Sequence, residues 1–360
     1  MGCGSRGVRC RDRRAWLIPC ASASALIILL TLCSSWLSPV GASAKSCTIF
    51  TISNGETVLF GNNEDHYDPG TVIEFSPATK TSHGLVRFGF RRDDGSFNLQ
   101  GVVNDQGLVW DGNGLPPARL NPHPEKTYSY RKDNYLNRIA REAATVEEAI
   151  RISRDFDFDH VHLEGRMTYQ IHIADATGDA VVISAGPDGE VAYTRKPPGN
   201  SYLISTNFNL ANPENGAKSW RYDKAAASLS GLLESTDMTL EDAVGVLDEV
   251  HLEDLISQTM YSNAIDLKNG VIALSYMARF DDMVYLDIDE ELAKGARIEE
   301  LRDRFSAETA EAGEAAYRRL AMKSRLSKAA AVVVLFALIV SAFLLVRSIR
   351  RSRRASRAVR

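Results

Sequence analysis

The feature that most constrains this chain is an uncharged apolar segment near its C-terminus, at residues 329–346. Its 18 residues (AAAVVVLFALIVSAFLLV) would span roughly 27 Å as a helix, close to the thickness of a bilayer's hydrocarbon core. Seven arginines and no acidic residue follow at residues 347–360. Because basic flanks of a membrane span stay in the cytoplasm, we expect a single transmembrane helix at 329–346 and a cytoplasmic Arg-rich tail at 347–360. The rest of the chain would then lie on the extracytoplasmic side of the cell membrane.

The N-terminus has the pattern of a secretory signal peptide, which we assign to residues 1–46. A basic region precedes an apolar core at 25–37 that is too short for a full membrane span, and small residues follow it. The small-x-small pattern permits cleavage after Ala44 or after Ser46, and the second cleavage would leave Cys47 as the first residue of the mature chain. An uncleaved membrane anchor is the alternative.

Charge and cysteine content constrain the part between the two ends. The 360 residues carry a formal net charge of -4, but the ends contribute +4 and +7 and leave -15 for residues 15–346. An acidic body argues against nucleic-acid binding. Four of the five cysteines fall within the signal region, so Cys47 is the single cysteine of the exported part, which therefore contains no disulfide of its own.

From residue 47 to residue 290, blocks of predicted strands alternate with pairs of predicted helices. Apolar alternation and turn signals predict strands at 48–53, 57–61, 71–76, 85–90, 98–103, 108–111, 168–175, 180–185, 191–194, 202–206, 258–266, 271–276 and 283–286. Helical spacing and cap signals predict helices at 130–144, 146–154, 219–233 and 240–250. Residues 290–328 are rich in Ala, Glu and Arg and are predicted to be helical, which makes 291–328 a stalk. This order predicts two sheets sandwiched between helix layers.

A cysteine at a mature N-terminus carries a thiol and a free α-amine on one residue. Their ordinary pKa values, about 8.5 and about 7.7–8.0, are close enough for the amine to accept the proton of the thiol. The amine can therefore act as general base for its own side chain. No catalytic histidine is then needed, and none of the seven histidines forms an obvious Cys/His arrangement in the sequence.

Five segments in a fixed order make the chain resemble the N-terminal-nucleophile (Ntn) amide hydrolases. This family includes choloylglycine (bile salt) hydrolase, penicillin V acylase, acid ceramidase and isopenicillin-N acyltransferase. The resemblance covers most of residues 47–290, and it implies an α+β fold, a four-layer αββα Ntn-hydrolase sandwich, ahead of the C-terminal single transmembrane helix. The segments are SCT with FGNNED (46–48 and 60–65), VNDQGLVWDGNGLP (103–116), ISTNFN (204–209), KSWRYDKA (218–225) and TMYSNAIDLKNG (259–270).

The resemblance also implies roles for individual residues. Cys47 matches the nucleophile, with its amine exposed by cleavage. Asp65 matches the aspartate that orients this amine. Asn207 matches the asparagine whose side-chain amide stabilises the tetrahedral oxyanion, and Arg221 matches the arginine that completes the polar network behind the nucleophile.

Two positions depart from the family pattern, which in cholylglycine-type enzymes reads Phe-Gly-Arg-Asn-x-Asp. Asn62 replaces the arginine, so the nucleophile lacks a nearby positive charge and the amine must carry more of the activation. This change favours the isopenicillin-N acyltransferase branch. The loop residue that donates to the oxyanion in bile salt and penicillin enzymes aligns with Gly114, and the adjacent Asn113 or a backbone N–H would have to replace it.

The sequence thus predicts an exported, membrane-anchored cysteine hydrolase that cleaves a linear amide C–N bond through an acyl-thioester on Cys47. The alternatives are an acyltransferase of the same fold, a catalytically silent membrane-anchored binding ectodomain, and a self-cleaving precursor. The expected partners are a small-molecule or lipid-like amide and the membrane, and a homo-oligomer is compatible with the sequence. No cofactor and no metal are expected, because packed or solvated histidines explain His160, His162 and His172 better than a metal site does.

Overall fold

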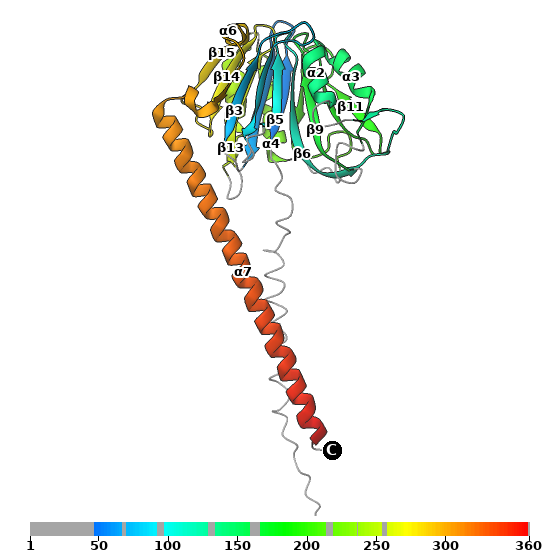
Figure 1. Ribbon diagram of the computed structural model, residues 1–360, viewed down its shortest axis with the longest axis vertical. Helices are drawn as coiled ribbons and strands as arrows, with labels where there is room; N and C mark the ends of the chain where they lie inside the picture. The colour runs from blue at the N-terminus through cyan, green and yellow to red at the C-terminus, as the bar shows by residue number, and fades with distance from the viewer. Residues whose placement is uncertain are drawn as a thin grey trace, which may run out of the picture. The chain divides into compact units, whose positions relative to one another are not determined.

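The structure is a computed structural model that describes residues 47–66, 70–91, 97–128, 134–158, 166–213, 219–235, 237–253 and 258–358. The signal peptide expected at 1–46, and the histidines His160 and His162, lie outside these residues. In the described part, two antiparallel sheets form the body together with pairs of helices (Figure 1), as the sequence predicts.

The first sheet begins at the start of the described chain. Its six strands lie in the order β12-β1-β2-β13-β14-β15, and every neighbouring pair is antiparallel. The predicted turn at Asn54 and Gly55 connects β1 to β2, and Gly55 has a φ of +89°, which glycine adopts without steric cost. The strands are β1 (Thr48–Ser53), β2 (Val58–His66), β12 (Ser201–Ser205), β13 (Gln258–Asp266), β14 (Val271–Tyr276) and β15 (Val284–Asp287).

The second sheet has eight strands in the order β11-β10-β9-β6-β5-β4-β3-β16, again antiparallel throughout. Two further short strands, β7 (Thr127–Tyr128) and β8 (Phe156–Asp157), form a separate parallel pair. The strands of the second sheet are β3 (Thr71–Ser76), β4 (Leu85–Arg91), β5 (Phe97–Asn104), β6 (Val109–Arg119), β9 (Arg166–Ala174), β10 (Ala180–Ala185), β11 (Val191–Arg195) and β16 (Arg297–Glu300).

Three buried hydrophobic clusters determine which surfaces pack together. The first lies between the sheets and takes Phe60 and Ile265 from the six-stranded sheet and Phe75 and Phe88 from the eight-stranded sheet. The second joins the other face of the eight-stranded sheet to α2 and α3, and the third joins the other face of the six-stranded sheet to α4 and α5. The sheets therefore pack face to face, each with a helix pair on its outer side. The helices are α2 (Tyr135–Glu142), α3 (Val146–Arg154), α4 (Trp220–Leu232) and α5 (Leu240–Glu249).

Side-chain caps fix where these helices begin. Thr145 caps α3 and forms a capping box with Glu148, as the Thr-x-x-Glu pattern predicts. Thr239 caps α5 in the same way. Helix α2 begins after Asn134, whose side chain accepts from a backbone N–H of the first turn, so it is shorter than the helix predicted at 130–144.

The helix predicted at 290–328 is wrong in its first part. This part forms a short helix, α6 (Ile288–Ala293), then the edge strand β16 and a 3₁₀ helix, η5 (Leu301–Arg304). Gly295, with a φ of +92°, ends α6 and turns the chain, and β16 pairs antiparallel with β3. Charged residues are common on edge strands, where they oppose pairing with other chains, so this strand has no apolar alternation to reveal it.

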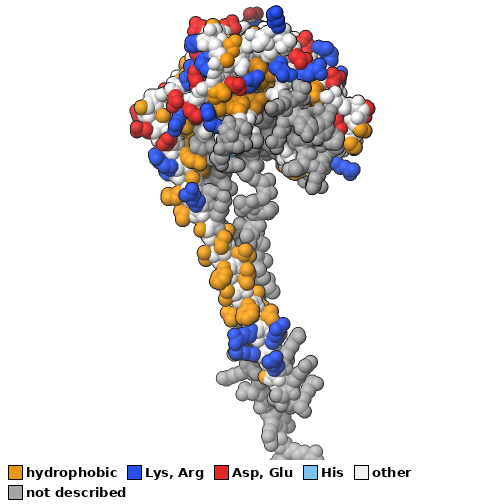
Figure 2. All heavy atoms as spheres, viewed as in Figure 1, with side chains coloured by type: hydrophobic (Ala, Val, Ile, Leu, Met, Phe, Trp, Pro, Cys, Tyr) orange, Lys and Arg blue, Asp and Glu red, His pale blue; other side chains and the backbone are white. Residues whose placement is uncertain are grey.

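Helix α7 (Ala307–Ala358) contains the apolar segment at 329–346 and continues into the arginine-rich residues (Figure 2). Its most apolar 18-residue window has a mean hydropathy of 3.0, and none of it is buried. In the part of the chain that the structure describes, this is the one helix long and apolar enough to cross a membrane. Its first turns pack on the body: Leu320 is buried in the core, and a Cβ at Gly313 would lie 2.5 Å from the Tyr276 ring.

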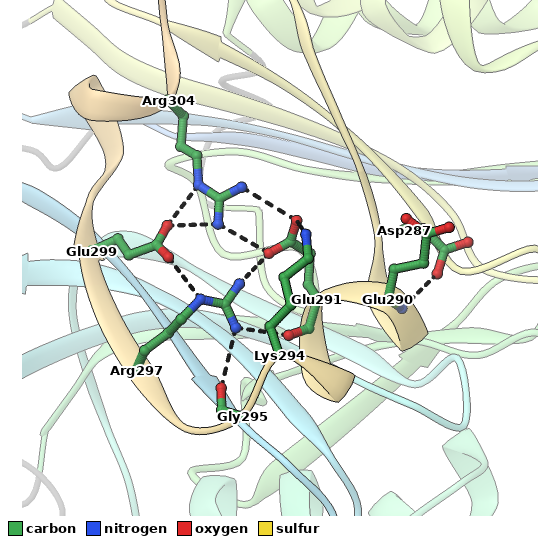
Figure 3. A network of polar contacts seen from close by, with 8 residues as sticks. All are labelled: Asp287, Glu290, Glu291, Lys294, Gly295, Arg297, Glu299 and Arg304. Atoms are coloured by element: carbon green, nitrogen blue, oxygen red, sulfur yellow. Dashed lines mark hydrogen bonds and ion pairs between the residues drawn. The ribbon is translucent and has the colours of Figure 1, made fainter.

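A polar network holds the segment between α6 and η5 in place (Figure 3). Glu291 on α6 is only 4% exposed and accepts hydrogen bonds from Lys294 at 2.7 Å, from Arg304 at 2.9 Å and from Arg297. Glu299 on β16 accepts from the same two arginines. Burial alone would raise the pKa of Glu291, but the hydrogen bonds and charges of Arg304 and Lys294 outweigh it and lower this pKa from 4.5 to about 2.

Replacing Glu291 with Gln should destabilise the fold, because Arg297 and Arg304 then lose the carboxylate that they share. We expect a loss of about 2 kcal/mol at neutral pH, which lowers the melting temperature of the full chain in detergent by about 4–8 °C. Because the folded-state pKa lies below the unfolded one, this stabilisation is present above about pH 4.5 and disappears as the pH falls toward 2.

The measurement is the melting temperature of wild type and Glu291→Gln between about pH 7 and pH 3. The two values should converge as the pH falls, and a difference that stays constant with pH would contradict the role of the ionised carboxylate. Glu311→Gln, at an exposed position on α7, is the matched control and should leave the melting temperature unchanged.

Candidate active site

Cys47 directly precedes β1, and its thiol points into the space between the two sheets. Side chains alternate along a strand, so Cys47 shares this face with Ile49, which packs in the core between the sheets. Cys47 is 1% exposed, and its Sγ donates a hydrogen bond to Glu64 Oε2 at 3.4 Å. Burial raises the pKa of this thiol well above its ordinary value, and the charges of Glu64, Asp65 and Asp111 raise it further. The thiol is therefore protonated at neutral pH.

The last residues of β2 divide between the two faces of the sheet. Asn62 and Glu64 point toward the eight-stranded sheet, where Asn62 Nδ2 donates to Asp111 Oδ2 at 2.9 Å. Asn63 and Asp65 point toward the helices, where Asn63 Nδ2 donates to a backbone carbonyl of α5 at 2.8 Å. Asn62, which stands at the arginine position of the family pattern, thus hydrogen-bonds a carboxylate instead of placing a cation beside the thiol.

Asp65 forms a buried ion pair with Arg221, in the first turn of α4. Arg221 Nη1 lies 2.9 Å from Asp65 Oδ2, and the two side chains are 5% and 0% exposed. The same guanidinium donates to Thr48 Oγ1 at 3.1 Å and to Asn207 Oδ1 at 2.7 Å. Thr259 Oγ1 on β13 donates to the other carboxylate oxygen of Asp65 at 2.5 Å. One ion pair therefore joins residues from β1, β2, β13, α4 and the segment after β12.

Asp65 has a raised pKa in spite of its partners. Burial raises it, Arg221 and the hydrogen bond from Thr259 lower it in part, and the result is about 7 rather than 3.8. Its carboxylate is ionised above this pH, where it can hold a positive charge nearby. A strongly shifted, buried carboxyl group that adjoins, in sequence, the residue in contact with the thiol is the kind of group that functional sites contain.

Asn207 and Asn113 differ in how far the structure connects them to Cys47. Asn207 lies just after β12, accepts from Arg221 and donates from Nδ2 to the Gly114 carbonyl at 3.0 Å. Asn113 is fully buried on β6, and neither atom of its amide has a hydrogen-bond partner among the described residues. The described contacts thus bring Asp65, Asn207 and Arg221 together behind Cys47 and leave Asn113 outside this network.

Four residues of the site escaped the sequence analysis, although all of them lie in the motifs that carried the resemblance. Glu64 and Asp111 lie close enough to act on the thiol, and Thr259 binds Asp65. Burial raises the pKa of Tyr261, and the charges of Glu64, Asp111 and Cys47 raise it further, so its hydroxyl lies near the same group. The period-two alternation of β2 and β6 could have placed Glu64 and Asp111 on particular faces of their strands, but a β-bulge between Thr259 and Tyr261 breaks this alternation in β13.

His172, considered above for a metal site, has a structural role. Its ring is fully buried between the sheets, hydrogen-bonded to Thr51 Oγ1 at 2.9 Å and to Ser205 Oγ at 3.0 Å. Burial lowers its pKa to about 3, so it is neutral at physiological pH. Among the described residues no group of three or more His, Cys, Asp and Glu side chains has the arrangement of a metal site.

Comparisons with known proteins identify a family and similar folds. Residues 52–260, more than half of the chain, match the family model described as acyl-coenzyme A:6-aminopenicillanic acid acyl-transferase. Two variants of the conjugated bile acid hydrolase from Clostridium perfringens have a similar fold. They share 15% and 16% sequence identity over 70% of this chain and over 95% and 96% of theirs, with TM-scores of 0.54 and 0.56.

A penicillin V acylase from Agrobacterium tumefaciens aligns over 70% of this chain and 90% of its own, with 14% identity and a TM-score of 0.49. No curated protein sequence gives a significant match. The likeness to the bile acid hydrolase is one of fold. The match to the family model, over residues 52–260, includes Asp65 on β2 as well as Asn207 and Arg221. The chain belongs to the acyl-coenzyme A:6-aminopenicillanic acid acyl-transferase family, and its fold is similar to that of the conjugated bile acid hydrolase.

Proposed function

We propose that the protein is a cysteine Ntn hydrolase that cleaves a linear amide C–N bond, with Cys47 as nucleophile. The single observation that carries this proposal is the buried Asp65–Arg221–Asn207 network behind the thiol of the chain's one cysteine outside residues 1–46. In the full-length chain the nitrogen of Cys47 is part of the peptide bond to Ser46. Cleavage of this bond frees an α-amine that activates the thiol, as proton acceptor or as a positive charge beside the thiolate.

The reaction has two halves. The Cys47 sulfur attacks the amide carbonyl carbon, the tetrahedral oxyanion collapses, and the C–N bond breaks to leave a thioester and a free amine. Water then attacks the thioester and releases the acid and the thiol. We assign the stabilisation of this oxyanion to Asn207, whose Nδ2 is a side-chain donor of the network. To bind the oxyanion, Nδ2 would first give up its hydrogen bond to the Gly114 carbonyl.

The proposal includes export and anchoring. Residues 1–46 act as signal peptide, the hydrolase domain begins at Cys47, the helix at 329–346 crosses the cell membrane, and residues 347–360 lie in the cytoplasm. Support comes from the unburied apolar window of α7 and from the arginines that follow it. The substrate is then a small-molecule or lipid-like amide that reaches the extracytoplasmic side.

Acyl transfer in the same site is the second candidate function, because the family model that matches is described as an acyl-transferase. A thioester reacts with an amine as readily as with water once the amine is bound, and both reactions use the same first half. The partition of product between acid and new amide, when a primary amine is added, distinguishes the two.

Replacing Cys47 with Ala should abolish turnover, because no other thiol remains in the mature chain. We expect a fall in kcat of at least about 10³-fold, measured on a panel of N-acyl arylamides with the full chain in detergent. Cys47→Ser keeps a weaker nucleophile in the same volume and serves as the test of correct folding. Undiminished hydrolysis by Cys47→Ala would exclude the proposed function and favour a binding ectodomain.

The mature chain should begin at Cys47. N-terminal sequencing of the active protein purified from membranes is expected to give Cys-Thr-Ile-Phe. A start at Lys45, as cleavage after Ala44 gives, would require a second trimming step before activity. Fully active protein that still carries residues ahead of Cys47 would rule out a role for the α-amine.

Replacing Asn207 with Ala should lower kcat by about 10²–10³-fold and change KM little, because an oxyanion donor acts on the transition state rather than on bound substrate. Steady-state kinetics on the best arylamide would measure both constants. Asn212→Ala in the same loop is the control and should retain wild-type values. An Asn207→Ala variant that changes KM alone would point to substrate binding instead.

A further inference from the structure

Glu64 occupies the one position that the family pattern Phe-Gly-Arg-Asn-x-Asp leaves open, so the resemblance assigns it no role. It is fully buried on β2, and its Oε2 accepts the hydrogen bond from Cys47 Sγ at 3.4 Å. This is a direct contact between a carboxylate and the atom that would react. Its effect on the reaction depends on which charged groups share its side of the sheet.

The groups that face Glu64 come from each neighbouring strand. They are Cys47 ahead of β1, Asp111 on β6 and the Tyr261 hydroxyl on β13. Arg221 lies on the other face of β2, where it binds Asp65, Thr48 and Asn207. Among the described residues, the thiol side of β2 therefore carries two carboxylates, Glu64 and Asp111, with Asn62 at the arginine position of the family pattern. His66 lies on the same side, two residues after Glu64, where its ring stacks on Phe90 with 4.4 Å between the ring centroids.

This charge pattern also acts on the α-amine that cleavage would expose. The amine belongs to the same residue as the thiol, so the carboxylates that oppose a thiolate favour a protonated amine. An ammonium group has no lone pair and cannot accept the proton of the thiol. It can donate a proton, however, and the nitrogen that leaves the substrate needs one.

We propose that Glu64 is a catalytic residue that accepts the Cys47 thiol proton as the sulfur attacks, while the Cys47 ammonium protonates the leaving nitrogen. The inference rests on the proposed function and specifies its proton transfers. In the first half, the S–H bond breaks and its proton moves to Glu64 Oε2. The S–C bond forms with the carbonyl electron pair moving to oxygen, and on collapse the C–N electron pair stays on nitrogen, which takes a proton from the ammonium.

The second half restores both groups. The neutral α-amine removes a proton from the attacking water, the C–O bond forms, and the C–S bond breaks with its electrons on sulfur. The sulfur then recovers its proton from the Glu64 carboxyl group. One water is consumed and one acid and one amine are released, so no further reactant is needed.

Glu64→Gln tests the proposal because it keeps the volume of the side chain and removes its ability to accept a proton. The expected result is a pair of opposite changes. Turnover of an N-acyl arylamide should fall by about 10²-fold or more, the usual contribution of a general base. Alkylation of Cys47 by iodoacetamide at neutral pH should be as fast as in wild type or faster, because one negative charge near the thiol is gone.

Two variants control the comparison. Glu64→Asp keeps a carboxylate, one methylene shorter, and should recover part of the lost turnover. Glu56→Gln, in the exposed turn between β1 and β2, should change neither turnover nor alkylation. A purely structural role for Glu64 would slow both measurements together in Glu64→Gln and give no recovery in Glu64→Asp, and that result would overturn the proposal.

The assay separates this inference from the proposed function. If Cys47→Ala is inactive while Glu64→Gln has wild-type turnover, Glu64 is not the proton acceptor, and the thiol mechanism stands. If Cys47→Ala retains turnover, the proposed function itself fails. Loss of turnover in Glu64→Gln with undiminished alkylation supports the proton transfer to Glu64.

Discussion

The candidate site depends on the buried ion pair between Asp65 and Arg221. Removing two charges from water is costly, and the attraction between them compensates only when their remaining hydrogen-bonding capacity is used. Here the carboxylate accepts from Arg221 and Thr259, and the guanidinium donates to Asp65, Thr48 and Asn207. The pair therefore fixes the start of β1, the end of β2, the start of β13 and the first turn of α4 relative to each other. Cys47 lies one residue before Thr48, so its position follows from the same contacts.

Strand β2 separates two electrostatic environments by the alternation of its side chains. Asp65 lies on the face with Arg221, and Glu64, its neighbour in sequence, lies on the face with the thiol and Asp111. Burial is the main reason that the pKa of the Cys47 thiol is raised, and the charges of Glu64, Asp65 and Asp111 raise it further. The nearby arginine does not offset this, because its charge is engaged by Asp65 on the other side of the sheet. The same separation gives Asn62 a physical role. Its amide donates a hydrogen bond to Asp111 and leaves the negative charge of this carboxylate in place, whereas a cation at this position would neutralise that charge.

The sequence predicted most of the strands because their signals are local. Strands β1, β3, β10, β13 and β14 have the predicted bounds, and so does α3, which a capping box starts. Strand β16 was missed because three of its four residues, RIEE, are charged and because it pairs with β3 only through the tertiary fold. In the site, motif order pointed to Asp65, Asn207 and Arg221, which the structure brings into one network, while their catalytic roles stay predictions. It did not single out Glu64, because alternation along β2 puts Glu64 and Asp65 on opposite faces but does not say which face holds the thiol until the partner strands are known.

The first turns of α7 connect the site to the proposed anchor. Leu320 is buried in the core between the sheets, and the apolar segment starts at residue 329, about 13 Å farther along the helix axis. Because the Glu291 network and Gly313 hold α6, β16 and the start of α7 against the body, the anchor joins the body without a flexible linker. An anchored protein of this design would keep its hydrolase domain close to the membrane surface, so amides that partition into the bilayer would be present near the domain at a higher concentration than in solution.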